Sequence, residues 1–197
     1  WVNEQDDQRM KGAFNMGIVS GWVAKDVQSA AKYVANLDRS RETGRMLGMV
    51  SVELLKQSRT TATNWAEGLE DEGIREDAFR SLSRVMARDD VEGTADWLQD
   101  HVNQKYSDES FDELAEEWSR KDPQAALEFF MQLPEGSSQR EGVVESVETW
   151  TRKDSDSAAE WINTQEGGPG KDLAVYSYAK EVVRDNPESA VEWASTI

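Results

Sequence analysis

The chain has 197 residues, of which 39 are acidic and 22 basic, and it contains one histidine and no cysteine. This composition excludes disulfides, thiol catalysis and zinc fingers, because each of them needs cysteine or several histidines. The formal net charge of -17 argues against binding to nucleic acid or to an anionic membrane, and no apolar run approaches the roughly 20 residues that span a bilayer.

The spacing of tryptophan reveals an internal repeat. The eight tryptophans fall into two classes on a 32-residue spacing, namely Trp1, Trp65, Trp97, Trp161 and Trp193 in the first and Trp22, Trp118 and Trp150 in the second. Tyr33 and Phe129 complete the first class, so that this position is aromatic in every unit. The spacing predicts a single helical-repeat domain over residues 1–197, with the tryptophans in its core.

Each unit is predicted to contain two helices. A residue that favours the helix N-cap recurs along the chain, as Asp26, Ser58, Asp90, Asp122, Asp154 and Asn186. Four positions later a small residue lets neighbouring helices approach closely, as Ala30, Ala62, Thr94, Ala126, Ala158 and Ala190. No segment alternates with period two for long enough to form a sheet. We therefore expect an all-α fold of roughly thirteen short helices and no strands.

One unit shows the helical faces most clearly. Its first helix carries Phe111, Leu114, Ala115 and Trp118 on one face, and its second carries Ala126, Phe129, Phe130 and Leu133. These spacings resemble tetratricopeptide repeats, although the period of 32 residues is shorter than that family's period of about 34. A HEAT-like array is the alternative. The resemblance implies an α-α superhelix, or solenoid, of about six helical hairpins that binds protein segments and has no chemistry of its own.

The two ends of the chain fall inside predicted units. Trp1 occupies the aromatic position of a second helix, and Ile197 lies four residues beyond the same position of the last unit. Because solenoids generally need polar capping helices, we expect the chain to be part of a longer array. The absence of cysteine and of a starting methionine favours a processed bacterial protein outside the cytoplasm, in the periplasm or the cell envelope.

Basic residues recur two positions before the caps, and we call them the basic ladder: Lys56, Arg88, Arg120, Arg152 and Arg184. Two structural explanations are an interaction with the helix dipole and ion pairs with Asp96, Glu128, Glu160 and Glu192 on the following helix. The functional interpretation is partner binding, in which the ladder grips the carboxylates of an extended acidic segment through bidentate bonds.

Carboxylates gather in two runs, residues 67–72 and 108–117, which are typical of solvated helix faces or of a surface for a basic peptide. They show neither a converging catalytic pair nor EF-hand spacing, and His101 has no second metal ligand of its kind. We therefore expect no enzyme activity, catalytic residue, metal or cofactor. The predicted function is a scaffold that binds a peptide or protein on a solenoid face. The alternatives are a structural spacer in a larger cell-envelope protein and a helical-toroid carbohydrate-active enzyme that uses acidic residues.

Overall fold

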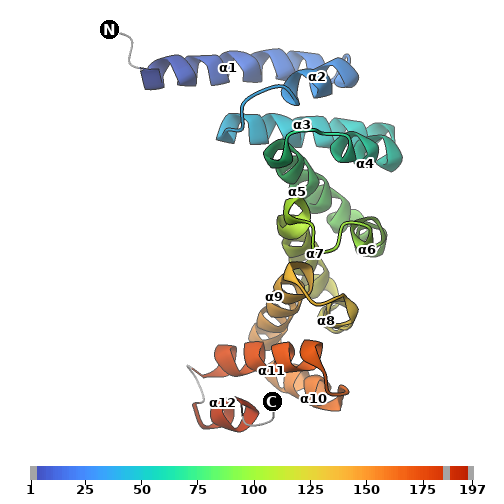
Figure 1. The fold of residues 1–197 in the computed structure, drawn as a ribbon, viewed down its shortest axis with the longest axis vertical. Coiled ribbons are helices and arrows are strands. Elements are labelled where there is room, and N and C mark those ends of the chain that lie inside the picture. Colours follow the sequence, from blue (N-terminus) through green and yellow to red (C-terminus); the bar gives the residue numbers. More distant parts are fainter. Residues whose placement is uncertain (1–3, 184–186, 195–197) are drawn as a thin grey trace. The chain divides into compact units, whose positions relative to one another are not determined.

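The described residues of the chain, 4–183 and 187–194 of a computed structural model, are helical and contain no strand, as the sequence predicts (Figure 1). The helices are α1 (Glu4–Val23), α2 (Val27–Val34), α3 (Arg41–Gln57), α4 (Arg59–Glu67), α5 (Glu72–Asp89), α6 (Val91–Gln99), α7 (Asp108–Lys121), α8 (Pro123–Gln132), α9 (Ser137–Lys153), α10 (Ser155–Thr164), α11 (Pro169–Val182) and α12 (Pro187–Ala194). A 3-10 segment, η1 (Lys105–Ser107), precedes α7. The expected helix around Trp1 lies outside the described residues. The chain forms two compact units, Trp1–Val85 and Met86–Ile197.

The predicted N-caps stand at the start of the second helix of each described hairpin. Asp26, Ser58, Asp90, Asp122 and Asp154 each accept a hydrogen bond from the backbone N–H three residues later, at 2.9–3.1 Å. Each bond satisfies an N–H group that has no partner inside the helix. These caps therefore fix where α2, α4, α6, α8 and α10 begin. The sixth predicted cap, Asn186, lies outside the described residues.

In the unit Trp1–Val85, the helix pairs pack through small residues. Helix α1 packs against α2 and α3, and α3 also packs against α2 and α4. Ala30 and Ala62, two members of the predicted small position, are fully buried. Leu47, Val50 and Leu54 extend the same core along α3. The small position thus places apolar helix faces in direct contact, as the sequence predicts.

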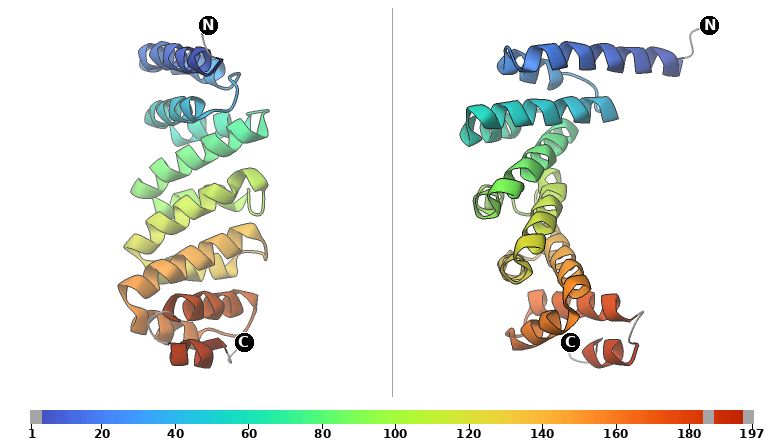
Figure 2. Two further views of the ribbon diagram at one scale, coloured as in Figure 1. Left: turned by 90° about the vertical axis from the view of Figure 1, so that its left-hand side faces the viewer. Right: turned by 180° about the vertical axis from the view of Figure 1, so that it is seen from behind.

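In the unit Met86–Ile197, α9 is the central helix. It packs against α7, α8, α10 and α11, and α11 packs against α12 (Figures 1 and 2). Phe111, Phe130 and Ile162 are fully buried among these helices. Lys121, the last residue of α7, donates from Nζ to the backbone oxygens of Ala87 (2.9 Å) and Arg88 (2.5 Å) and so caps the end of α5.

The tryptophans differ in burial, and both buried ones belong to the second class. Trp118 and Trp150 are buried, whereas Trp22, Trp65, Trp97, Trp161 and Trp193 are half-buried. Ring pairs join residues eleven apart in three hairpins: Trp22 with Tyr33, Trp118 with Phe129 and Trp150 with Trp161, with centroids 5.1–5.9 Å apart. The core interpretation therefore holds fully for Trp118 and Trp150. The half-buried tryptophans are partly exposed to solvent. Trp1 lies outside the described residues.

Two buried serines give a stability prediction. The Oγ atoms of Ser51 and Ser83 are buried and have no hydrogen-bond partner within the described residues. Ser83→Ala should raise the free energy of unfolding by about 1 kcal/mol, because it removes an unpaired desolvated hydroxyl and adds the best helix former. Urea denaturation measures this change.

Ser119→Ala is the matched control. The Ser119 hydroxyl is also buried, but it donates to Oγ of Ser146 at 3.0 Å. Its removal should lower the free energy of unfolding by about 1 kcal/mol, since Ser146 then loses its partner. Equal effects of Ser83→Ala and Ser119→Ala would contradict the explanation.

Candidate anion-binding cleft

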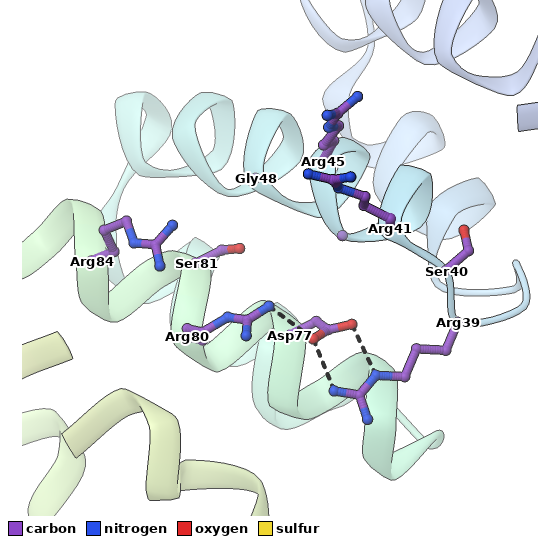
Figure 3. Close-up of a pocket in the computed structure, with 10 residues that line it drawn as sticks. Arg39, Ser40, Arg41, Arg45, Gly48, Asp77, Arg80, Ser81 and Arg84 are labelled. Carbon is purple, nitrogen blue, oxygen red and sulfur yellow. Dashed lines mark hydrogen bonds and ion pairs between the residues drawn. The ribbon is translucent and has the colours of Figure 1, made fainter. Parts of the chain in front are cut away.

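A cleft of about 640 Å³ in the unit Trp1–Val85 concentrates positive charge. Five arginines line it together with two serines, two glycines and one aspartate: Arg39, Arg41, Arg45, Arg80, Arg84, Ser40, Ser81, Gly44, Gly48 and Asp77 (Figure 3). Five guanidinium groups and one carboxylate leave a formal charge of +4, in a chain whose formal net charge is -17. We call this site the arginine cleft.

Helix periodicity places the arginines. Arg41 and Arg45 lie one turn apart on α3, and Arg80 and Arg84 lie one turn apart on α5 (Figure 3). Helix α3 begins at Arg41 because Oγ of Ser40 accepts a hydrogen bond from the N–H of Thr43 at 3.1 Å. The cap, directly before the arginine pair, thus fixes the residue at which α3 begins.

Two glycines keep the floor of the cleft open. Gly44 and Gly48 lie one turn apart on α3, interleaved with the arginine pair. A Cβ atom at Gly44 would meet nothing within 4 Å, and one at Gly48 would meet only Oγ of Ser81 at 4.0 Å. The space above this stretch of α3 is therefore free of side chains.

Asp77 fixes two of the arginines. Its carboxylate, almost fully buried, accepts hydrogen bonds from Nε (3.1 Å) and Nη2 (3.0 Å) of Arg39 and from Nη2 of Arg80 (3.2 Å) (Figure 3). Arg39 also donates to Glu76 at 2.8 Å. The hydrogen bonds to Asp77 and Glu76 raise the pKa of Arg39 above its ordinary value. Asp77 therefore holds the guanidinium groups of Arg39 and Arg80 in place.

Arg41 and Arg45 differ from that pair. Both side chains are exposed, and within the described residues neither makes a hydrogen bond or an ion pair. Like charges one helical turn apart repel each other by a few tenths of a kcal/mol. An anion bound between them would remove this repulsion, and their planar donor groups suit carboxylate and phosphate oxygens. The arginine cleft is thus chemically suited to bind an anion.

The four described members of the basic ladder are exposed and engaged in ion pairs. Lys56 pairs with Glu53 (2.7 Å), and Arg88 pairs with Glu117 (3.5 Å). Arg120 pairs with Glu116 and with Glu117, at 3.0 Å to the latter. Arg152 pairs with Glu148 (3.1 Å) and with Glu181 (3.3 Å). Of the acidic partners expected from the sequence, Asp96, Glu128 and Glu160 make no ion pair with the ladder in the described part of the chain. Arg184 and the side chain of Glu192 lie outside it.

The exposed ion pairs of the basic ladder are compatible with its predicted role in binding a partner. Exposed ion pairs of this kind contribute only about 0–1 kcal/mol, so a ligand carboxylate can replace a glutamate at little cost. Partner binding by the ladder stays a prediction.

The second acidic run contains one perturbed carboxyl group. Partial burial is the largest cause that raises the pKa of Asp112 to about 6. Repulsion by neighbouring carboxylates adds to it, from Glu141, Glu145, Glu109 and Asp108. Across the described residues, no group of three histidine, cysteine, aspartate or glutamate side chains could hold a metal ion. The raised pKa therefore arises from partial burial first and from crowded negative charge on α7 and α9 second.

Asp112 predicts a pH-dependent change in stability. Its folded-state pKa lies above the ordinary value of 3.8, so the folded state binds the proton more strongly and stability falls as pH rises from about 4 to about 6. Asp112→Asn should raise the free energy of unfolding at pH 7.5 by roughly 1 kcal/mol, a figure reduced for the solvent-exposed part of the side chain. The gain should vanish near pH 4.

Thermal unfolding at the two pH values measures the effect of Asp112→Asn. Glu160→Gln, at an exposed carboxylate on α10, serves as the control. A gain for Asp112→Asn that is the same at both pH values would show that the raised pKa is not its cause.

Sequence reasoning missed the arginine cleft. The available signal was the pair of arginines four residues apart, at Arg41 and Arg45 and again at Arg80 and Arg84. Comparison with known proteins finds no matching family model, no matching curated protein and no matching solved structure. Among the helices described, none combines the length and the apolar character needed to cross a membrane.

Proposed function

We propose that the chain is a non-enzymatic scaffold that binds an acidic segment of a partner protein and anchors it in the arginine cleft. The observation that carries this proposal is the concentration of five arginines around one open space in a strongly acidic protein. Two of them, Arg41 and Arg45, make no ion pair within the described residues. Positive charge without an internal counter-ion is costly to maintain, which supports a ligand of opposite charge.

The proposed architecture is an α-solenoid of about six 32-residue hairpins, similar to tetratricopeptide or HEAT-like arrays. Its support is the recurrence of the N-caps and of the aromatic pairs at the same spacing. Stacked hairpins expose helix faces over a long distance, and such faces bind extended segments. The basic ladder, Lys56, Arg88, Arg120, Arg152 and Arg184, would add carboxylate contacts along such a segment.

The net charge of the chain limits how the partner is bound. Beyond about 8 Å in physiological salt the acidic surface and the cleft are screened from each other, so the +4 cleft acts only locally. A partner must therefore place its carboxylates inside the arginine cleft to gain from them. Binding should weaken as salt is added, because the contacts are charged and partly exposed.

Fluorescence anisotropy with a labelled peptide of glutamate and glycine tests the proposal. Arg41→Gln with Arg45→Gln should weaken binding by about tenfold or more, since each lost charge-assisted contact costs roughly 1.5 kcal/mol. Arg120→Gln with Arg152→Gln, which removes the same charge from the basic ladder, should weaken it less. Neither pair should lower the melting temperature by more than a few degrees.

Two outcomes would overturn the proposal. Binding of a lysine and glycine peptide as tight as that of the acidic peptide would exclude recognition of anions. No binding of the acidic peptide at low salt would favour a structural spacer instead.

A further inference from the structure

We infer that the unit Met86–Ile197 carries a second docking surface, a groove between α6 and α8 that binds a lysine or arginine side chain of a basic partner segment. Helices α6 and α8 are the second helices of successive hairpins (Figure 1). The groove has a volume of about 350 Å³ and is lined by Gln99, Val102, Phe129, Gln132, Leu133 and Pro134. We call it the α6–α8 groove. It shares no residue with the arginine cleft and takes a ligand of the opposite charge.

The two units of the chain differ in charge. Residues 1–85 contain 12 basic and 13 acidic residues, whereas residues 86–197 contain 10 basic and 26 acidic ones. The second unit therefore has a formal charge of -16, which is almost the whole net charge of the chain. A surface of one sign attracts ligands of the opposite sign, so this unit favours a cationic partner.

The lining of the α6–α8 groove suits the stem of a long cationic side chain. Val102, Phe129 and Leu133 supply apolar surface, and the ring of Phe129 is only half-buried. Lysine and arginine lay their methylene stems on such surface and keep the charged head in water, and the head also gains from an aromatic face. The amide groups of Gln99 and Gln132 make no hydrogen bond within the described residues, so their oxygens can accept from the head.

Two carboxylates lie one helical turn from the groove. Asp96 precedes Gln99 by three residues on α6, and Glu128 precedes Gln132 by four on α8, so each shares a helix face with a lining residue. Both carboxylates are exposed, and in the described part of the chain neither makes an ion pair or a hydrogen bond. The glutamates beside the basic ladder, by contrast, are already paired. The groove thus has two strong acceptors that the chain itself does not use.

The carboxyl ends of the two helices add negative potential. Helix α6 ends at Gln99 and α8 ends at Gln132, and neither has a basic residue in its last turn. The carboxyl end of a helix carries roughly half a negative charge, which a nearby cation stabilises. Basic residues provide that cation in the last turns of α5, α7 and α9. The ends of α6 and α8 lack it.

The end of α10 shows what such a cation does. Lys171 donates from Nζ to the backbone oxygen six residues earlier, directly after α10, at 2.8 Å. At the 32-residue spacing Lys171 corresponds to Gln139 and Ser107, which make the same bond after α8 and α6 from neutral side chains, at 2.8 and 2.6 Å. The chain thus supplies a cation at the end of α10 and none at the ends of α8 and α6. The partner's lysine or arginine takes that place in the α6–α8 groove.

Fluorescence anisotropy at physiological salt tests the inference with a labelled peptide of arginine and glycine, and with the same peptide in which neutral citrulline replaces arginine. The arginine peptide should bind at least tenfold more tightly. Asp96→Asn with Glu128→Gln should weaken its binding about tenfold, because two exposed ion pairs are lost. Asp172→Asn with Glu188→Gln, at exposed positions on α11 and α12, removes the same charge and should weaken binding less than twofold.

A second variant supplies the missing cation from the chain itself. Gln132→Lys places an ammonium group at the end of α8, where it should compete with the peptide and weaken its binding about tenfold. The melting temperature should not fall, since a cation suits the carboxyl end of a helix. Thr164→Lys adds the same charge at the equivalent exposed end of α10 and should bind the peptide nearly as the wild type does.

The variants distinguish the possible failures. Equal binding of the arginine and citrulline peptides would exclude recognition of a cation. Equal losses for Gln132→Lys and Thr164→Lys would show attraction by the acidic unit as a whole and would overturn the groove as the site. A dimer in analytical ultracentrifugation that Gln132→Lys dissociates would show a second copy in the groove and would overturn a separate partner. None of these results bears on acidic peptides in the arginine cleft, so the proposed function is tested separately.

Discussion

Replacing Gly142 with alanine should lower the free energy of unfolding by about 3 kcal/mol, an effect typical of overpacking in a filled core. Gly142 lies buried in α9, where an added Cβ would come within 2.0 Å of Cδ1 of Phe130. Phe130 is itself fully buried on α8. The methyl group therefore forces α8 and α9 apart. Urea denaturation followed by tryptophan fluorescence measures the loss.

Two further variants identify the cause. Gly17→Ala makes the same change on α1, where nothing lies within 4 Å, and should raise the free energy of unfolding by about 1 kcal/mol. Adding Phe130→Leu to Gly142→Ala should restore part of the loss, because it removes the atoms that the methyl group meets. A double variant less stable than Gly142→Ala would rule out this clash as the cause.

Replacing Gly136 with alanine should lower the free energy of unfolding by about 2–3 kcal/mol, through the loss of about three hydrogen bonds. The added Cβ would lie 2.0 Å from Oδ1 of Asn103. Asn103 joins two loops, because its backbone N–H donates to Oγ of Ser138 (2.9 Å), its Nδ2 donates to the oxygen of Glu135 (3.1 Å), and its Oδ1 accepts from the N–H of Ser138 (3.3 Å). Displacing Asn103 breaks all three bonds.

Hydrogen exchange and thermal unfolding measure the effect of Gly136→Ala. Gly167→Ala, in the loop between α10 and α11, has nothing within 4 Å of the new Cβ and should change little. Asn103→Ala should reproduce most of the loss seen with Gly136→Ala. Equal stability of the Gly136 and Gly167 variants would show that Asn103 can move aside without cost.

Local chemistry explains which parts of the fold can be predicted from the sequence. An N-cap such as Asp122 bonds to an amide three residues away, so its role depends on no other part of the chain. Ala126 and Leu114 are predicted to be buried because they recur on one face of a helix, and both are fully buried. The partners of the basic ladder are not predicted in this way: pairing with the following helix is expected from the sequence, whereas Arg152 pairs with Glu148, four residues earlier on its own helix.

The arginine cleft could not be found in the same way. At the 32-residue spacing seen in the sequence, Arg80 corresponds to Gly48 and Asp77 to Arg45, so no recurring position of that spacing contains the cluster. The cleft arises from tertiary structure, which brings non-equivalent positions of α3 and α5 around one space (Figure 3). The free space around Gly44 likewise depends on the tertiary structure and cannot be deduced from the position of Gly44 in the sequence.

The position of Lys121 has a consequence for how this part of the molecule melts. Its ammonium group donates to Ala87 and Arg88, so the final turn of α5 is completed by a side chain from α7. Fraying of α7 at its carboxyl end therefore uncovers two carbonyl groups in the preceding hairpin. Such a cross-link makes the opening of the carboxyl end of α7 and the opening of the last turn of α5 cooperative, because each loses hydrogen bonds when the other unwinds.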